Sequence, residues 1–200
     1  MRWPYQRKIT IAAGLAGMSL LIIPAAASAS TADTTVSSVI SPVISLLSSS
    51  GTVNLNATPT GSGVQTIASD TVTVSTNDSA GYTLKLGETG VSSALTSGGN
   101  TIPAVSGTQA SPVAETANSW GYRVDGVGGF GAGPTSAASN QAIASTKFAA
   151  IPATGSPDTL VTTSTTASSA TTTVWYGVAV NTSAVSGTYT NDVTYTATAN

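Results

Sequence analysis

The stretch Val174-Trp175-Tyr176-Gly177-Val178-Ala179-Val180 predicts a β-strand that is buried on both faces. Successive side chains of an extended chain point to opposite faces, so the first, third, fifth and seventh residues form one row. Tryptophan, glycine and alanine form the other row. Neither row is polar, which is typical of a strand that is covered on both sides. The stretch therefore indicates a β-protein with a layered core.

The C-terminal residues predict a second strand with one solvent-exposed face. Apolar residues alternate there with Thr188, Thr190, Asp192, Thr194, Thr196 and Thr198, and the apolar row is Tyr189, Val193, Tyr195, Ala197 and Ala199. A slip of one residue would expose that whole row, so the pairing register is well specified. We expect a long terminal hairpin strand that closes a sheet.

A β-hairpin is predicted around the turn Asn77-Asp78-Ser79-Ala80-Gly81. Val72 and Val74 alternate with polar residues before the turn, and a Tyr-x-Leu-x-Leu pattern, residues 82–86, follows it. Two alternating runs joined by a short loop that contains glycine are typical of paired antiparallel strands. A shorter alternation at Val53 and Leu55 predicts one more strand of this kind.

The other segments are less regular. Val36 to Leu47 is rich in β-branched residues, and Pro42 in its middle favours an edge strand or a bulge. Trp120, Tyr122 and Val124 share one face of a further strand. Ala132 to Ala150 fits one short helix or none, and the shape of the low-complexity stretch from Thr162 to Thr173 stays open.

These segments together predict an all-β fold. About eight short β segments are separated by glycine and proline turns, and no stretch keeps a helical period. We therefore expect an antiparallel β-sandwich of immunoglobulin-like type, with a barrel as the competing architecture.

The N-terminal residues Met1 to Ala29 have the three parts of a cleavable signal peptide. Basic residues come first, an apolar run from Ile9 to Ile23 follows, and Ala27-Ser28-Ala29 matches the small-residue pattern before a cleavage at Ser30. The alternative is a membrane anchor, but the apolar run as a helix spans only about 22 Å, against about 30 Å of hydrocarbon. We expect export, with no stable transmembrane segment after cleavage.

The mature chain is predicted to have a flexible leader, residues 30–35, and a single domain, residues 36–200. Its 171 residues carry three basic and eight acidic side chains, a net charge of −5, and 60 of them are serine or threonine. This balance argues against nucleic acid, whose phosphates need clustered lysine and arginine. The chain has no cysteine and no histidine, which excludes thiol chemistry and histidine-based acid–base catalysis.

The sequence predicts no catalytic residue, metal or cofactor. A glycoside hydrolase needs two carboxyl groups brought together, and the only glutamates are Glu88 and Glu115. We interpret both as solvated turn residues. A cation site at Asp125 lacks the dense spacing of acids in calcium loops, and the glycines that follow it lack the lysine of a phosphate loop.

The aromatic residues offer two interpretations. Trp175, Trp120 and Tyr122 are the candidates for a binding platform, because aromatic faces stack on sugar rings. The other interpretation, which we favour, makes the aromatic set the bulk of the core. Trp175 is the expected exception, since it points away from the row of Val174 and Val178.

Several stretches resemble uncharacterised secreted surface proteins of small-genome candidate-phyla bacteria. The resemblance covers nearly the whole mature chain and rests on residues 40–45, Ser69 to Asn77, Ala80 to Leu84, Trp120 to Asp125 and Gly187 to Asn200. The ending is also similar to the WxL domain of Gram-positive cell-surface proteins, which attaches to the wall. Tyr195-Thr196-Ala197 stands where that domain has its second Trp-x-Leu. Both resemblances imply a sandwich fold at the cell surface or outside the cell.

Together these features predict a noncatalytic, secreted or cell-surface structural or adhesive protein of the bacterial envelope. The alternatives are a carbohydrate- or cell-wall-binding module and, less favoured, a glycoside hydrolase. The expected partners are surface glycans or further copies of the chain itself.

Overall fold

The computed structural model describes residues 29–134 and 136–200, which divide into two units, one ending at Val39 and one spanning Ile40–Asn200. The predicted signal peptide up to Ser28, with Ala27 of the cleavage motif, lies outside the described residues. Ala29 and Ser30 are exposed. In the first unit, residues 29–39 have no regular structure and are exposed throughout.

The second unit is all-β in its described residues, and every pairing between its strands is antiparallel. The fold class predicted from the sequence is confirmed at this level. No helix in the described part of the chain is long and apolar enough to cross a membrane.

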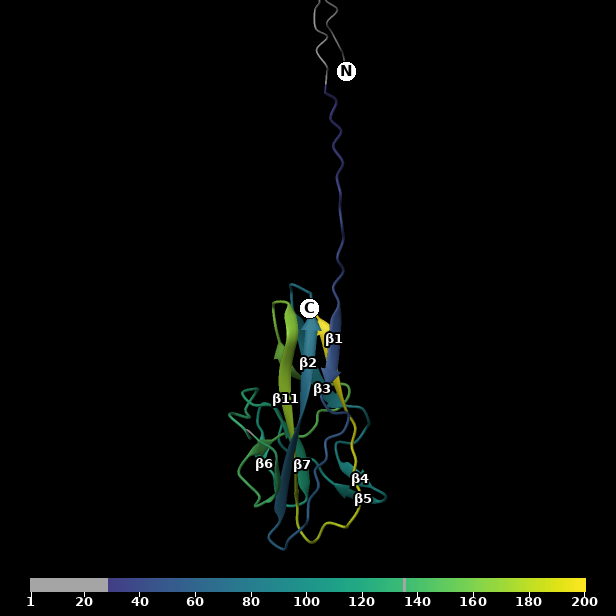
Figure 1. The fold of residues 1–200 in the computed structure, drawn as a ribbon. Helices are drawn as coiled ribbons and strands as arrows, with labels where there is room; N and C mark the ends of the chain where they lie inside the picture. Colours follow the sequence, from purple (N-terminus) through teal and green to yellow (C-terminus); the bar gives the residue numbers. More distant parts are fainter. Residues whose placement is uncertain (1–28, 135) are drawn as a thin grey trace, which may run out of the picture. The chain divides into compact units, whose positions relative to one another are not determined.

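The larger sheet is built on two long strands, β2 (Val64–Thr76) and β11 (Ala167–Val180) (Figure 1). The order across this sheet is β1 (Ile44–Ser48), β2, β11 and β7 (Ser119–Arg123). The short β8 (Ala138–Gln141) pairs with the start of β2, whereas β1 pairs with its end. The edge beside the second half of β2 is therefore formed by β1.

The smaller sheet has the order β10 (Asp158–Thr162), β3 (Tyr82–Glu88) and β12 (Val193–Ala199). The alternation predicted for the C-terminal residues is confirmed, because Val193, Tyr195, Ala197 and Ala199 are half-buried and the threonines between them are exposed. β12 pairs with β3, in the register Tyr195 to Leu86. The predicted closing of a sheet is correct, but the strand is not the second arm of a hairpin.

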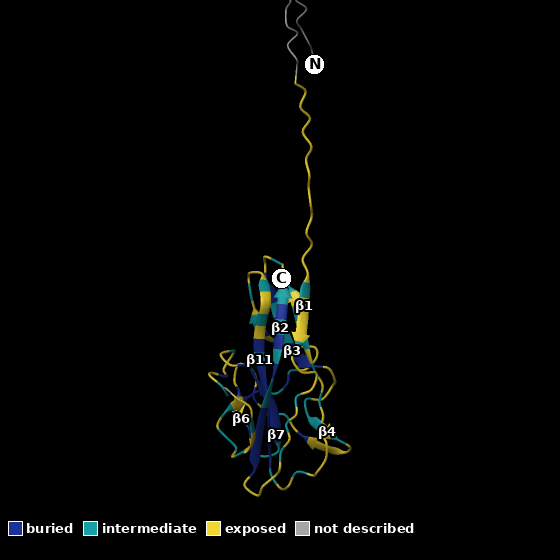
Figure 2. Ribbon diagram, viewed as in Figure 1, coloured by how far each residue is buried: buried dark blue, intermediate teal, exposed yellow. Residues whose placement is uncertain are grey.

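The two sheets share one core, and buried residues run along the middle of the domain in Figure 2. The large sheet contributes a row of inward side chains that includes Val72, Val174 and Tyr176, and the small sheet contributes Tyr82 and Leu84. These side chains are 4% exposed or less. The arrangement is sandwich-like, with the outer faces of both sheets rich in serine and threonine.

A further layer covers the lower half of the large sheet. This outer layer contains the pair β6 (Val113–Ala114) with β9 (Lys147–Phe148), whereas the pair β4 (Leu95–Ser97) with β5 (Asn100–Ile102) packs on the main core through Leu95 and Ile102. Phe148 and Val105 form a second buried cluster with Ile67 of β2 and Trp175 of β11. The prediction that β11 is buried on both faces is confirmed, since residues 174–180 are all buried.

The predicted hairpin at residues 77–81 is wrong. Both of its strands exist, but β2 lies in the large sheet and β3 in the small one, so the turn carries the chain between the two layers. Gly81 has a φ of 86° and lies against Thr163, where a Cβ would be 2.4 Å from the carbonyl oxygen. Thr163 belongs to the loop that carries the chain from β10 in the small sheet to β11 in the large sheet. The two connections between the sheets therefore lie in contact at Gly81, where there is no room for a side chain.

Two other segments differ from expectation, and the structure defines two whose form the sequence leaves open. The strand predicted from Val36 begins only at Ile44, because Pro42 has no N–H and β2 ends at Thr76, opposite Ile44. Val53 and Leu55 are half-buried but unpaired with any described strand. The described part of residues 132–150 contains strands β8 and β9 and no helix. The stretch from Thr162 to Thr173 contains the end of β10, the loop that connects the two sheets and the first half of β11.

Candidate functional sites

The aromatic side chains proposed for binding lie inside the protein. Trp120 and Tyr122 belong to the main core, and Trp175 belongs to the second cluster. Tyr122 is 0% exposed and Trp175 is 8% exposed. The interpretation of these rings as core is confirmed, and the expected exposure of Trp175 is wrong.

Trp175 is buried because a glycine pair lets the outer layer approach. Gly177 of β11 pairs with Gly121 of β7, and the Phe148 side chain and the Ala149 carbonyl lie against this pair. A Cβ on Gly121 would be 2.6 Å from the Ala149 oxygen. Since the layer packs directly on the glycines, it also covers the neighbouring tryptophan.

Glu115 is buried beneath the same layer, which corrects its interpretation as a solvated residue. Its Oε2 accepts a hydrogen bond from Gln65 Nε2 at 2.6 Å. Its Oε1 has no hydrogen-bond partner among the described residues, and it lies against Gly177 and the Phe148 ring. Burial raises the pKa of Glu115 from 4.5 to about 8, and the bond from Gln65 lowers it by less.

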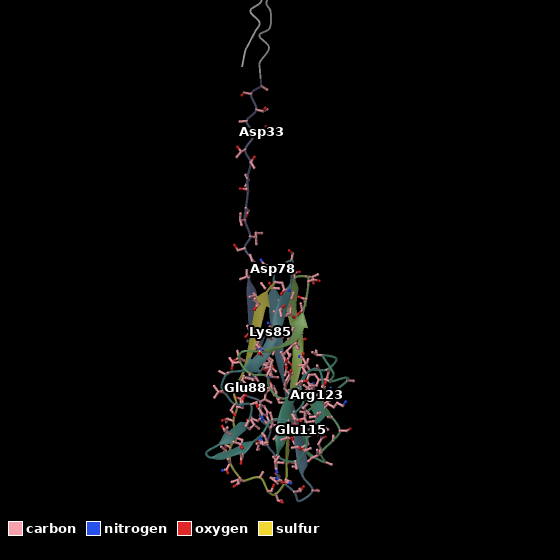
Figure 3. All side chains as sticks on the ribbon, turned by 180° about the vertical axis from the view of Figure 1, so that it is seen from behind. Asp33, Asp78, Lys85, Glu88, Glu115 and Arg123 are labelled. Carbon is pink, nitrogen blue, oxygen red and sulfur yellow. The ribbon has the colours of Figure 1, made fainter. Side chains whose placement is uncertain are left out.

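Glu88, at the end of β3, is also buried and not solvated. Its Oε1 accepts a hydrogen bond from Asn191 Nδ2 at 3.3 Å, and its backbone nitrogen donates to the Pro152 oxygen. Glu88 and Glu115, both labelled in Figure 3, share no hydrogen-bond partner among the described residues. Their surroundings give each carboxyl group a structural role.

Arg123 of β7 is the largest fully buried side chain among the described residues, and it is labelled in Figure 3. Its Nε and Nη2 donate to Asp125 Oδ1 at 3.0 and 2.9 Å. It also donates to the carbonyl oxygens of Lys147, Phe130 and Gly131. One guanidinium group therefore fixes the glycine-rich loop, residues 125–131, against the outer layer.

Tyr122 and Asp158 join the two sheets. The Tyr122 hydroxyl donates to Asp158 Oδ2 at the start of β10. Burial and the neighbouring carboxylate both raise the pKa of Tyr122. No group of three or more acidic, histidine or cysteine residues suited to a metal ion occurs in the described ranges.

Asp70 is a buried carboxyl group that ties strand β1 to the core. Its Oδ2 accepts from Ser48 Oγ at 2.6 Å, and its Oδ1 accepts from Ser49 Oγ and Ser50 N at 2.8 and 3.1 Å. The hydroxyls of Tyr176 and Tyr195 are within 2.7 Å of each other nearby. Burial raises the pKa of Tyr195, and Asp70 raises it further.

Asn77 holds the other end of β1. Its Oδ1 accepts from Val43 N at 2.7 Å, and its Nδ2 donates to the Ser41 oxygen at 3.1 Å. These two bonds replace the strand ladder on either side of Pro42, which has no N–H to donate. β1 is therefore fixed at both ends by side chains of β2 and the turn that follows it.

The outer edge of β1 is open. Ser49 N donates to the Thr71 oxygen at 2.8 Å, and bonded positions alternate along an antiparallel ladder. The backbone groups of Ile44, Leu46 and Ser48 therefore point away from β2, where no described strand pairs with them. Leu47 is 69% exposed on the outer face, and β1 is coloured largely as exposed in Figure 2.

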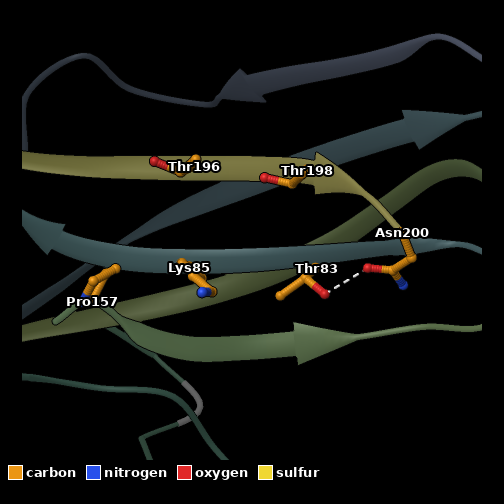
Figure 4. A pocket seen from close by; sticks show the side chains of 6 residues that line it. All are labelled: Thr83, Lys85, Pro157, Thr196, Thr198 and Asn200. Atoms are coloured by element: carbon orange, nitrogen blue, oxygen red, sulfur yellow. Dashed lines mark hydrogen bonds between the residues drawn. The ribbon is translucent and has the colours of Figure 1, made fainter.

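The surface clefts formed by the described residues include two that have polar linings. The larger, of about 440 Å³, crosses the outer face of β3 and β12 and is lined by Thr83, Lys85, Pro157, Thr196, Thr198 and Asn200. Figure 4 shows Lys85 in the middle and the hydrogen bond from Thr83 Oγ1 to Asn200 Oδ1, of 2.7 Å. The smaller, of about 180 Å³, lies between β5 and the loop that precedes β12.

Fold and sites together define a class: an all-β protein with two main antiparallel sheets, in which Asp70, Glu115 and Arg123 are buried. Comparison with known proteins adds no closer identification, since no family model, curated protein or solved structure matches the chain.

Sequence reasoning missed the sites at Asp70 and Glu115, whereas Pro42 correctly indicated an edge position for the strand that the structure shows as β1. Asp70 carries a local signal, because it continues the even-numbered row of Val72 and Val74 and so faces inward. The burial of Glu115 has no such signal, since it depends on contacts with Phe148 and Gly177, which are distant in the sequence.

Proposed function

We propose that the protein is a noncatalytic, secreted or cell-surface structural and adhesive protein of a bacterial envelope, with a β-sandwich of immunoglobulin-like or WxL-like type. The signal-peptide pattern supports export. The engagement of Asp70, Glu115 and Arg123 in structural contacts supports a noncatalytic role.

The observation that carries the proposal is the open edge of β1. Folded proteins protect sheet edges with lysine, proline, bulges or covering segments. The strand Ile-Ser-Leu-Leu-Ser contains no charge, no proline and no register shift against β2. It is also fixed at both ends by Asn77 and Asp70, so its backbone groups are already arranged to accept another strand.

The partner that fits this edge is β1 of a second copy. The outward residues Ile44, Leu46 and Ser48 are symmetric about Leu46, so an antiparallel pair centred on Leu46 would place Ile44 of one copy opposite Ser48 of the other. Every outward N–H and C=O would then be paired, and Leu47 and Val43 would add apolar contacts. Five residues form a short interface, so we expect association that depends on high local concentration, as at a surface.

Sedimentation velocity across a concentration series tests the proposal. Leu46→Pro removes an outward N–H while leaving the bonds to β2 intact, and Leu46→Ala is its matched control because it shortens the same side chain but keeps the N–H. Leu47→Lys adds the charge that edges usually carry, with Val91→Lys as the control at an exposed valine in a loop.

We expect the wild-type protein, Leu46→Ala and Val91→Lys to associate as the concentration rises, and Leu46→Pro and Leu47→Lys to stay monomeric. Near-ultraviolet circular dichroism checks that each variant is folded. A monomeric wild-type protein at its solubility limit, or association that Leu46→Pro and Leu47→Lys leave unchanged, would refute the proposal.

A further inference from the structure

The smaller cleft has an uncharged, polar lining. One wall is β5, with Asn100, Thr101 and Ile102, and the other is the loop between β11 and β12, with Ser183 and Tyr189 among its residues. The Asn100 and Thr101 side chains are exposed and make no hydrogen bond to the described part of the chain. Amide and hydroxyl groups are therefore available to a ligand, beside a half-buried aromatic ring.

The cleft is held rigid by Asn118 at its base. This residue has a φ of 64°, which is uncommon for a residue other than glycine. Its Nδ2 donates to Asn181 Oδ1 and Ser183 Oγ at 2.9 and 2.8 Å, and its Oδ1 accepts from Asn181 N at 3.1 Å. One residue in the left-handed region thus fixes the loop to the start of β7.

The Tyr189 ring is fixed as well. Its hydroxyl donates to the Val185 oxygen at 2.7 Å, and the next residue, Thr190, forms a backbone bridge with Thr96 of β4. A fixed ring and a fixed loop lower the entropic cost of binding. Tyr189 lines the cleft together with amide and hydroxyl groups, and an aromatic ring with hydrogen-bonding groups beside it is the combination that a sugar ring requires.

We propose that this cleft binds one neutral sugar ring of a glycan, stacked on Tyr189 and hydrogen-bonded by Asn100 and Thr101. The volume of about 180 Å³ is below the ~300–1,000 Å³ of sites for drug-sized ligands, so a single ring is the ligand that fits. No charged residue lines the cleft, so acidic sugars gain nothing there. β5, which forms one wall of the cleft, lies toward the end of the domain that is away from the start of β1 (Figure 1).

The site is independent of the β1 edge, so its test can fail while edge pairing holds. The test is a titration of the isotope-labelled protein with methyl glycosides of neutral hexoses and of N-acetylhexosamines, and with a uronic acid, followed by amide chemical shifts. We expect the amides of Asn100, Thr101 and Ser183 to shift with a neutral sugar, with a dissociation constant on the order of 1 mM. The uronic acid is expected to bind no more tightly.

Two variants test the contacts. Asn100→Ala and Tyr189→Leu are each expected to weaken binding at least tenfold, whereas Asn54→Ala, at an exposed asparagine outside the cleft, is expected to bind as the wild type does. Tyr189→Phe keeps the ring and is expected to retain binding. It serves as the second test of this position in case Tyr189→Leu does not fold. The proposal is overturned if none of the neutral sugars shifts the cleft amides, or if Asn100→Ala binds with unchanged affinity.

Discussion

Glu115 makes the stability of the protein depend on pH in a direction opposite to that of most carboxyl groups. In the folded protein its pKa is about 8, because it is buried beneath Phe148, and its ordinary value is 4.5. Below pH 4.5 the group is protonated in both the folded and the unfolded chain and costs nothing. Between the two values the unfolded chain has lost the proton and the folded chain still holds it, so folding stability falls as pH rises.

The size of this loss of stability follows from the pH range between the unfolded and the folded pKa of Glu115. The pKa of Glu115 rises by three to four units on folding, and each unit corresponds to about 1.4 kcal/mol. The free energy of unfolding is therefore lower by about 4 to 5 kcal/mol at pH 8 and above. That is a large share of the ~5–15 kcal/mol that stabilises a typical domain. Glu115→Gln keeps the shape and an acceptor for Gln65 but cannot ionise, so the variant should lack this loss.

Urea unfolding from pH 4 to pH 9, followed by the fluorescence of Trp120 and Trp175, measures the difference. Both tryptophans are buried in the folded domain and report its unfolding. We expect the variant and the wild type to approach each other in stability at the acidic end and the variant to be the more stable above pH 7. Two stability profiles that run parallel over this range would refute the burial and protonation of Glu115.

Two further substitutions test the contacts on either face of the large sheet. Asp70→Asn is expected to lower the free energy of unfolding by about 2 to 3 kcal/mol, because an amide nitrogen cannot accept the hydrogen bonds that Ser48, Ser49 and Ser50 donate. Hydrogen exchange should then show β1 opening first. Unchanged protection of β1 would contradict the role of Asp70 in holding this strand. Gly177→Ala would place a Cβ 2.7 Å from both Glu115 Oε1 and Phe148 Cζ, and is expected to cost about 1 to 3 kcal/mol in a thermal or urea melt. Gly51→Ala, with no atom within 4 Å, serves as its control, and equal stability of the two variants would contradict the close packing.

Side-chain alternation predicted which faces are buried. The two-sided burial of Val174 to Val180 and the half-buried row of β12 both follow from the period of two along the chain. Alternation carries no information about which strand lies beside which. Val72 and Leu84 are both inward-facing, and that pattern fits a hairpin in one sheet as well as two strands facing each other across a core.

The burial of Trp175 and Glu115 depends on contacts between distant segments. Phe148 reaches β11 because Gly121 and Gly177 are side by side in the register of β7 and β11, and this register is visible only in the folded chain. The edge position of β1 is indicated by Pro42, but the direction of its backbone groups depends on its register with β2, which is visible only in the folded chain.

The central claim, that β1 is a preformed edge awaiting a second copy, is tested most directly by amide hydrogen exchange measured residue by residue at low and high protein concentration. The account predicts that the Leu47 amide, directed at β2, is protected at both concentrations. The Leu46 amide, directed outward, should exchange rapidly in dilute solution and become protected as the protein is concentrated. Leu46 exchange that does not change with concentration would contradict the account.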